Sequence, residues 1–222
     1  MRPDLLLRLL SEETGERLFA MDLAAAAGYA ARDPGAAPPA ADKVAVIPLQ
    51  GVLSANGVRF FGRQLTPGMN TFRQALAAAV ANPEVGAIVL DCDSPGGTVA
   101  GTPETADAVR AAAQAKPVAA MVDTLCASAA YWIASQAGQI WANPSAELGS
   151  IGVMAGHMEF SRALDKDGVT ATIIRSKSAQ FKNEANPFEP LSEDALAALQ
   201  TSADEAEDVM ISAIASGRRT TP

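Results

Sequence analysis

Cysteine and histidine are scarce in this sequence of 222 residues. It contains two cysteines, Cys92 and Cys126, and one histidine, His157. Two cysteines cannot form a disulfide framework, so the sequence favours a reducing compartment, with both thiols as small core residues. Aromatic residues make up 5% of the chain, whereas hydrophobic residues make up 49%. Such a composition suits alanine-rich helices packed closely on a sheet.

The sequence also lacks a positive net charge and long apolar runs. The formal net charge is -8, which disfavours nucleic-acid binding because that needs a basic face. No run of about 18 apolar residues occurs, so the sequence predicts no membrane span. The apolar residues 5–7 are followed by Arg8 and Glu12, which is unlike a signal peptide, and a cytoplasmic protein is expected.

The first part of the chain differs in character from the rest. Between residues 3 and 27, apolar side chains recur at helical spacing. Residues 36–41 contain two prolines and are typical of a linker. We therefore expect residues 1–42 to form an N-terminal helical arm with its linker, and residues 43–222 to form the main domain.

Apolar runs alternate with amphipathic segments in this domain. Continuous apolar runs predict strands buried on both faces, as in parallel sheets. Strands are expected at residues 44–49, 85–90, 118–122, 140–142, 149–155 and 170–174, and irregular structure at 56–70. Helices are expected at residues 71–80, 103–113, 131–137, 160–166 and from the cap Ser192 to the stop Gly217. The alternation predicts an α/β fold with a largely parallel sheet, and its repeat of about 30 residues fits stacked strand–helix units.

Ser128 lies where an expected strand gives way to an expected helix. Its neighbours Ala127, Ala129 and Ala130 are small enough to let a substrate backbone approach. The N–H groups at the start of the helix suit an oxyanion, so Ser128 is a candidate nucleophile. An ordinary helix-capping serine on a buried helix would give the same pattern, and both interpretations stay open.

Two other features bear on this chemistry. The pair Gly96-Gly97 follows a strand and could offer N–H groups to an oxyanion, or could simply form a tight turn. No phosphate-binding glycine motif follows it. A serine nucleophile needs a base, which could be His157 or a lysine such as Lys182, although either could equally be a surface residue.

Four segments taken together resemble one family. They are residues 91–97 (DCDSPGG), 127–131 (ASAAY), 149–153 (GSIGV), and Lys182 with the following stretch 186–192 (NPFEPLS). In this order the segments resemble the signal peptide peptidase family of serine proteases, in its phage branch of minor capsid protein C and head maturation proteases. The resemblance runs from about residue 44 to about residue 218.

The resemblance implies a Clp protease/crotonase-like fold and a Ser–Lys dyad. On the matching positions, Ser128 would be the nucleophile and Lys182 the general base, with Ser150 orienting the lysine amine. The N–H groups of Gly97 and Ala129 would form the oxyanion hole.

The resemblance also implies what surrounds the site. Gly96 and Ile151 would line the bound substrate. Substrates would be proteins or peptides, among them phage scaffold or capsid proteins, and the chain would act as a homo-oligomeric ring or dome, in the cytoplasm or in a phage procapsid there. Neither a cofactor nor a metal is implied.

Three departures from the family pattern stand out. Ala129 and Ala130 replace the glycines that many relatives carry after the nucleophile. The membrane anchor of bacterial signal peptide peptidases is absent, which favours the phage role. The chain stops at Pro222, where relatives continue with a further segment, so a C-terminal truncation is expected.

Other functions fit parts of the pattern. A host peptidase that degrades signal-peptide remnants or misfolded proteins would use the same residues. A crotonase-like acyl-CoA enzyme would use the glycine turn but need neither Ser128 nor Lys182. A non-catalytic capsid assembly protein would keep only the fold.

Overall fold

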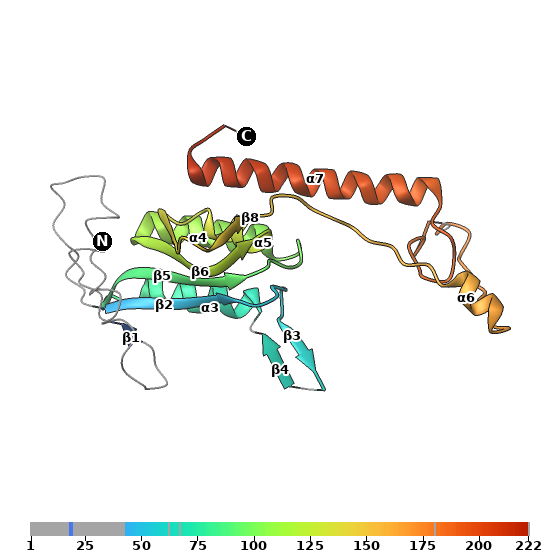
Figure 1. The fold of residues 1–222 in the computed structure, drawn as a ribbon, viewed down its shortest axis with the longest axis horizontal. Coiled ribbons are helices and arrows are strands. Elements are labelled where there is room, and N and C mark those ends of the chain that lie inside the picture. Colours follow the sequence, from blue (N-terminus) through green and yellow to red (C-terminus); the bar gives the residue numbers. More distant parts are fainter. Residues whose placement is uncertain (1–17, 20–42, 62, 67, 180, 222) are drawn as a thin grey trace. The chain divides into compact units, whose positions relative to one another are not determined.

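The chain folds as two compact units (Figure 1). The computed structural model describes residues 18–19, 43–61, 63–66, 68–179 and 181–221. The first unit extends to Ile151 and resumes at Met210, and the second comprises Gly152–Val209. The predicted arm, residues 1–42, lies outside the described residues except for Leu18 and Phe19, so the boundary after residue 42 stays a prediction.

A largely parallel sheet forms the centre of the first unit. Its strands are β1 (Leu18–Phe19), β2 (Lys43–Gln50), β5 (Val85–Ser94), β6 (Val118–Ala127), β7 (Gln139–Ala142) and β8 (Glu147–Gly149). β2, β5, β6 and β7 are hydrogen-bonded in this order and run parallel, while β8 pairs in parallel with the end of β6. The predicted α/β class with a largely parallel sheet is confirmed.

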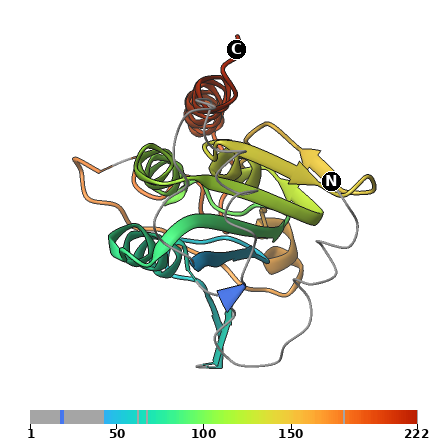
Figure 2. The same ribbon diagram turned by 90° about the vertical axis from the view of Figure 1, so that its left-hand side faces the viewer.

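Two helices cover one face of this sheet. α3 (Met69–Ala81) and α4 (Thr102–Ala115) lie side by side against it (Figure 2). Alternate residues of β5, including Leu90 and Cys92, are fully buried. Asp93 lies between buried neighbours on the same strand and is exposed. This alternation lets β5 continue past the apolar run that predicted it, because successive side chains point to opposite faces.

The long helix α7 (Glu193–Arg218) begins at the predicted cap. The hydroxyl of Ser192 accepts a main-chain N–H of the first turn at 3.0 Å. The predicted stop at Gly217 is wrong, because the helix continues one residue further. A Cβ at Gly217 would lie 2.4 Å from the carbonyl oxygen of Ser135. Glycine therefore permits close packing here, and Arg219, with φ 56°, ends the helix.

Two further predictions failed because pairing overrode local patterns. Leu18 and Phe19 were expected in a helix but pair with Ala45 and Val44 of β2. Residues 56–70 were expected to be irregular, yet β3 (Val58–Phe60) and β4 (Arg63–Thr66) form an antiparallel hairpin.

The second unit contains α6 (Ser161–Lys166) and the first part of α7. The strands predicted at 149–155 and 170–174 are wrong: β8 ends at Gly149, and residues 170–174 form no strand. Apolar residues set a side-chain period, but a strand also needs a backbone partner. Among the described residues, no helix is long and apolar enough to cross a bilayer.

Candidate active site

Ser128 occupies a sharp turn between β6 and α5 (Ala129–Ala134). Its φ of 53° and ψ of -124° are strained for a residue with a side chain. The Ser128 N–H donates to the carbonyl of Gly149 at 2.8 Å, and its own carbonyl accepts the N–H of Trp132 at 2.9 Å. A serine held in this way between a strand and a helix has the geometry of a nucleophile elbow.

Buried packing fixes the turn from both sides. Ala130 and Ile133 of α5 are completely buried, and Trp132 is 2% exposed. On the strand side, Cys126 is completely buried beside Cys92, as predicted for core thiols. A hydrogen bond with Cys126, and then burial, raise the pKa of the Cys92 thiol well above its usual value, which keeps that thiol uncharged.

The glycine turn after β5 lies directly against Ser128. The Ser94 hydroxyl donates to the carbonyl of Gly51 at 2.6 Å and accepts the N–H of Gly96 at 3.1 Å. Gly96 has a φ of 98°, and a Cβ there would lie 2.7 Å from the Cβ of Ser128 and 3.0 Å from the nitrogen of Ala129. Only glycine fits at this position without displacing the serine.

Gly97 is locked in place by a neighbouring loop. A Cβ on Gly97 would lie 1.8 Å from the carbonyl oxygen of Leu53. Leu53 donates its N–H to Gly96 at 2.8 Å and accepts the N–H of Thr98 at 2.9 Å. Within the described part of the chain, the N–H groups of Gly97 and Ala129 make no hydrogen bond. Both predicted oxyanion donors are therefore available beside Ser128.

Ser150 follows the last residue of β8. Gly149 pairs with Ala127, so Ser150 comes directly after the residue whose carbonyl holds Ser128. Ser150 has a φ of 51° and is exposed, and Ile151 is 49% exposed. The first unit thus brings together the predicted nucleophile, both predicted oxyanion donors and the predicted lysine-orienting serine.

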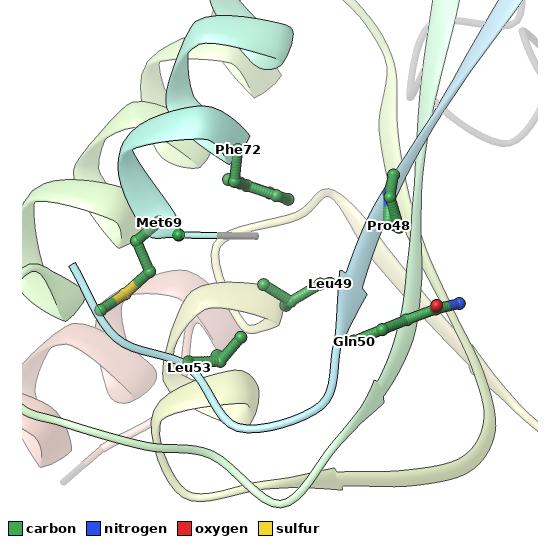
Figure 3. Close-up of a pocket in the computed structure, with 7 residues that line it drawn as sticks. Pro48, Leu49, Gln50, Leu53, Met69 and Phe72 are labelled. Atoms are coloured by element: carbon green, nitrogen blue, oxygen red, sulfur yellow. The ribbon is translucent and has the colours of Figure 1, made fainter. Parts of the chain in front are cut away.

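A small hollow lies beneath the loop that carries Leu53. It has a volume of about 10 Å³, enough for one water. Figure 3 shows Leu49 pointing toward Met69 and Phe72 of α3 and Leu53 pointing toward Leu49, whereas Gln50 points away. These side chains are largely apolar, and they back the glycine turn with packed core.

Lys182 lies in the second unit, in a series of turns. Its N–H donates to the carbonyl of Ala179 at 3.0 Å, and its side chain is exposed. Lys182 forms no ion pair with any described residue. The nearest acid in sequence, Glu184, accepts a hydrogen bond from the Ser192 hydroxyl at 3.3 Å. That contact occupies the Glu184 carboxylate at the start of α7.

His157, the other candidate base, has a different partner. Its Nε2 lies 2.9 Å from the carbonyl oxygen of Asn186. A carbonyl can only accept, so Nε2 must carry the proton and donate it. This bond ties His157 to the loop of the second unit and is typical of a structural histidine.

A comparison with protein families decides the relationship. The sequence model of Peptidase family S49 matches residues 110–222, just over half of the chain. The chain belongs to Peptidase family S49. The matched span of this S49 chain includes Ser128, Ser150 and Lys182, whereas the glycine turn at Gly96 and Gly97 precedes it.

Two phage proteins are similar to the S49 chain. It is 35% identical over 161 residues to Capsid assembly protease C of Escherichia phage lambda, covering 72% of this chain and 36% of that protein. It is 32% identical over 174 residues to Head-tail preconnector protein GP5 of Enterobacteria phage P21, covering 78% and 34%. The S49 chain thus spans about a third of the length of these relatives.

A solved structure, that of the 1510-N membrane-bound stomatin-specific protease, is 17% identical to the S49 chain. Its TM-score is 0.38, and the match covers 75% of this chain and 68% of that one.

One polar network in the second unit was not predicted from the sequence. Arg175, Glu189 and Asn186 hold the turns around Lys182 by side-chain hydrogen bonds. Arg175 and Glu189 are 14 residues apart, and the described residues between them form turns and irregular structure, with no helix or strand whose period would bring the two side chains together. In the described residues, no group of three or more His, Cys, Asp or Glu side chains could hold a metal ion.

Proposed function

We propose that this S49 chain is a serine endopeptidase in which Ser128 attacks the carbonyl carbon of a peptide bond. The main support is the strained turn that sets Ser128 against two unbonded N–H groups, those of Gly97 and Ala129. Such donors stabilise the negative oxygen of a tetrahedral intermediate by roughly 3 kcal/mol each. An acyl-enzyme on Ser128 forms as the amine leaves, and water then hydrolyses it.

Lys182 is the proposed general base. It takes the Ser128 proton in the attack and returns it to the leaving amine. A lysine can do this only when its amine is uncharged, which requires an apolar surrounding without a paired carboxylate. Lys182 is exposed in the single chain, so this surrounding would have to come from bound substrate or from the homo-oligomer proposed below. Two observations support the assignment: Lys182 forms no ion pair with any residue that the structure describes, and the Glu184 carboxylate accepts a hydrogen bond from Ser192. Ser150 is the proposed neutral partner that aims the amine.

The proposed substrates are phage head proteins, such as scaffold or capsid proteins. The two phage relatives support this role through their names, a capsid assembly protease and a head-tail preconnector. The alanines around Ser128 and the proposed substrate-lining residues Gly96 and Ile151 favour small apolar side chains beside the cleaved bond. The active form is proposed to be a homo-oligomer, with Lys182 supplied by the same chain or by a neighbouring copy.

Digestion of head proteins tests this function. Wild type and Ser128→Ala are incubated with purified scaffold and capsid proteins, and cleavage sites are read by mass spectrometry. Wild type is expected to cut and Ser128→Ala is expected to leave the substrates intact, while a fluorophosphonate probe labels Ser128 in the wild type only. Equal cleavage by both proteins, or a wild type that the probe does not label, contradicts the proposal.

A further inference from the structure

The Arg175 side chain donates hydrogen bonds to the main-chain carbonyls of two consecutive residues, Lys182 and Asn183. Its Nε donates to the carbonyl of Lys182 at 2.7 Å, and its Nη2 donates to the carbonyl of Asn183 at 3.3 Å. The same guanidinium pairs with both carboxylate oxygens of Glu189, at 2.5 and 3.3 Å. One planar group with several fixed donors therefore binds three acceptor groups at once, two main-chain carbonyls and one carboxylate.

The backbone at Asn183 is strained, and the Asn186 side chain also donates a hydrogen bond to it. Asn183 has a φ of 60°, which costs free energy for a residue with a side chain. Its carbonyl also accepts a hydrogen bond from the Asn186 amide at 2.9 Å. That amide donates in addition to Glu189 at 2.7 Å, and Asn186 is 2% exposed. A conformation of this kind persists only where its surroundings enforce it.

The pair differs from an ordinary surface ion pair. The side chains of Arg175 and Glu189 are 19% and 37% exposed, whereas those of Arg110 and Asp107 on α4 are 46% and 65% exposed. Among the described residues, the ion pair of Arg110 is with Asp107, one turn away on the same helix. Arg175, in contrast, joins residues that are 7, 8 and 14 positions away in sequence, so it fixes the course of a loop.

We propose that Arg175, braced by Glu189, is the positioning residue for the general base: by fixing the main-chain carbonyls of Lys182 and Asn183, it sets where the Lys182 amine lies. This inference rests on the proposed function, because it assumes that Lys182 takes the Ser128 proton. In this proposal Arg175 acts through the Lys182 loop and has no direct role toward the substrate or the reacting atoms. Its loss therefore acts on the chemical step and leaves substrate binding nearly unchanged.

The test compares Arg175→Met with the matched control Arg110→Met in the full chain. With a fluorogenic alanine-rich peptide, Arg175→Met is expected to lower kcat about 30-fold or more with little change in KM, because small displacements of a catalytic group cost up to about 100-fold. Labelling of Ser128 by a fluorophosphonate slows in parallel. Arg110→Met behaves as wild type. Arg175→Lys recovers only part of the rate, because one ammonium cannot reach all three acceptors.

A second variant, Glu189→Gln, tests the inference even if Arg175→Met does not fold. Glu189→Gln keeps the shape of the brace but removes its charge, and kcat is expected to fall by roughly 3- to 10-fold at an unchanged KM. Wild-type kcat in Arg175→Met, or an unfolded Arg175→Met beside a wild-type kcat in Glu189→Gln, overturns the inference. If Lys182→Ala is itself fully active, the Ser–Lys assignment fails instead, whatever Arg175 does.

Discussion

The turn that carries Ser128 and the loop that carries Lys182 are stabilised by different means. Ser128 is held by main-chain hydrogen bonds and by side chains packed completely out of solvent, such as Ala130 and Cys126. The loop around Lys182 is held by hydrogen bonds from the side chains of Arg175 and Asn186. The first region depends on shape, whereas the second depends on charge.

The two regions should therefore be sensitive to different changes: the turn at Ser128 to added side-chain volume, and the loop around Lys182 to pH and salt. Close packing transmits strain and tolerates almost no added volume, so steric changes near Ser128 should be severe. Charge-assisted hydrogen bonds at half-exposed sites weaken with acid and with salt. The lysine loop should therefore respond to solution conditions that leave the serine turn unaffected.

The largest expected effect separates the two candidate bases. Lys182→Ala should abolish peptidase activity, by about 1,000-fold or more, because no other group is proposed to take the serine proton. His157→Ala should retain activity, because its Nε2 is engaged with the carbonyl of Asn186. Cleavage of an alanine-rich peptide measures both. An inactive His157→Ala beside an active Lys182→Ala would reverse the assignment to a Ser–His site.

A steric change at the glycine turn should come next in size. Gly97→Ala places a methyl group 1.8 Å from the carbonyl oxygen of Leu53, so the two segments must separate. We expect a loss of about 3 kcal/mol in the free energy of unfolding, measured by urea denaturation, together with lower activity. Gly156→Ala is the control, because nothing lies within 4 Å of its added Cβ. Equal stabilities would show that the turn tolerates a side chain.

The smallest expected effect concerns acid and the lysine loop. The Arg175 guanidinium, and then the Asn186 amide, hold the pKa of Glu189 below its usual value. A lowered pKa means that this carboxylate stabilises the folded chain above a pH of about 4.3, its unfolded pKa, and that the contribution is lost as pH falls through the lower folded pKa.

Thermal unfolding of wild type and Glu189→Gln measures this loss. Wild type should melt higher between about pH 5 and 7, and the difference should shrink toward zero as the pH approaches the lowered pKa. Salt should reduce the difference at neutral pH. A difference that grows on acidification would mean that Glu189 is not held by Arg175 in the folded chain.

The sequence predicted well wherever one local signal was enough. Continuous apolar runs located β2, β5 and β6, because strands buried on both faces need no polar face. The small residues around Ser128 and the pair Gly96-Gly97 marked the serine turn, since close approach of backbones restricts residue size. The sequence could not show that Ser128 has positive φ, or that its N–H donates to Gly149 of β8, because both are properties of the folded backbone.

Structural features that depend on partners distant in sequence could not be predicted from the sequence. The hairpin of β3 and β4 has no clear apolar alternation, and residues 170–174 have one without forming a strand. The bonds from Arg175 to Lys182 and Glu189 form within a segment of turns, in which no helix or strand brings the three residues together. Only a folded loop reveals that these polar side chains act together.

The contact between Gly96 and Ser128 also limits how this site can evolve. A side chain at Gly96 would collide with the Cβ of residue 128, which alanine and serine both carry. A mutation that removes only the hydroxyl of Ser128 leaves that collision unchanged. In descendants that lose catalysis, we therefore expect Ser128 to be replaced early, whereas Gly96 is retained long afterwards because the steric restriction remains.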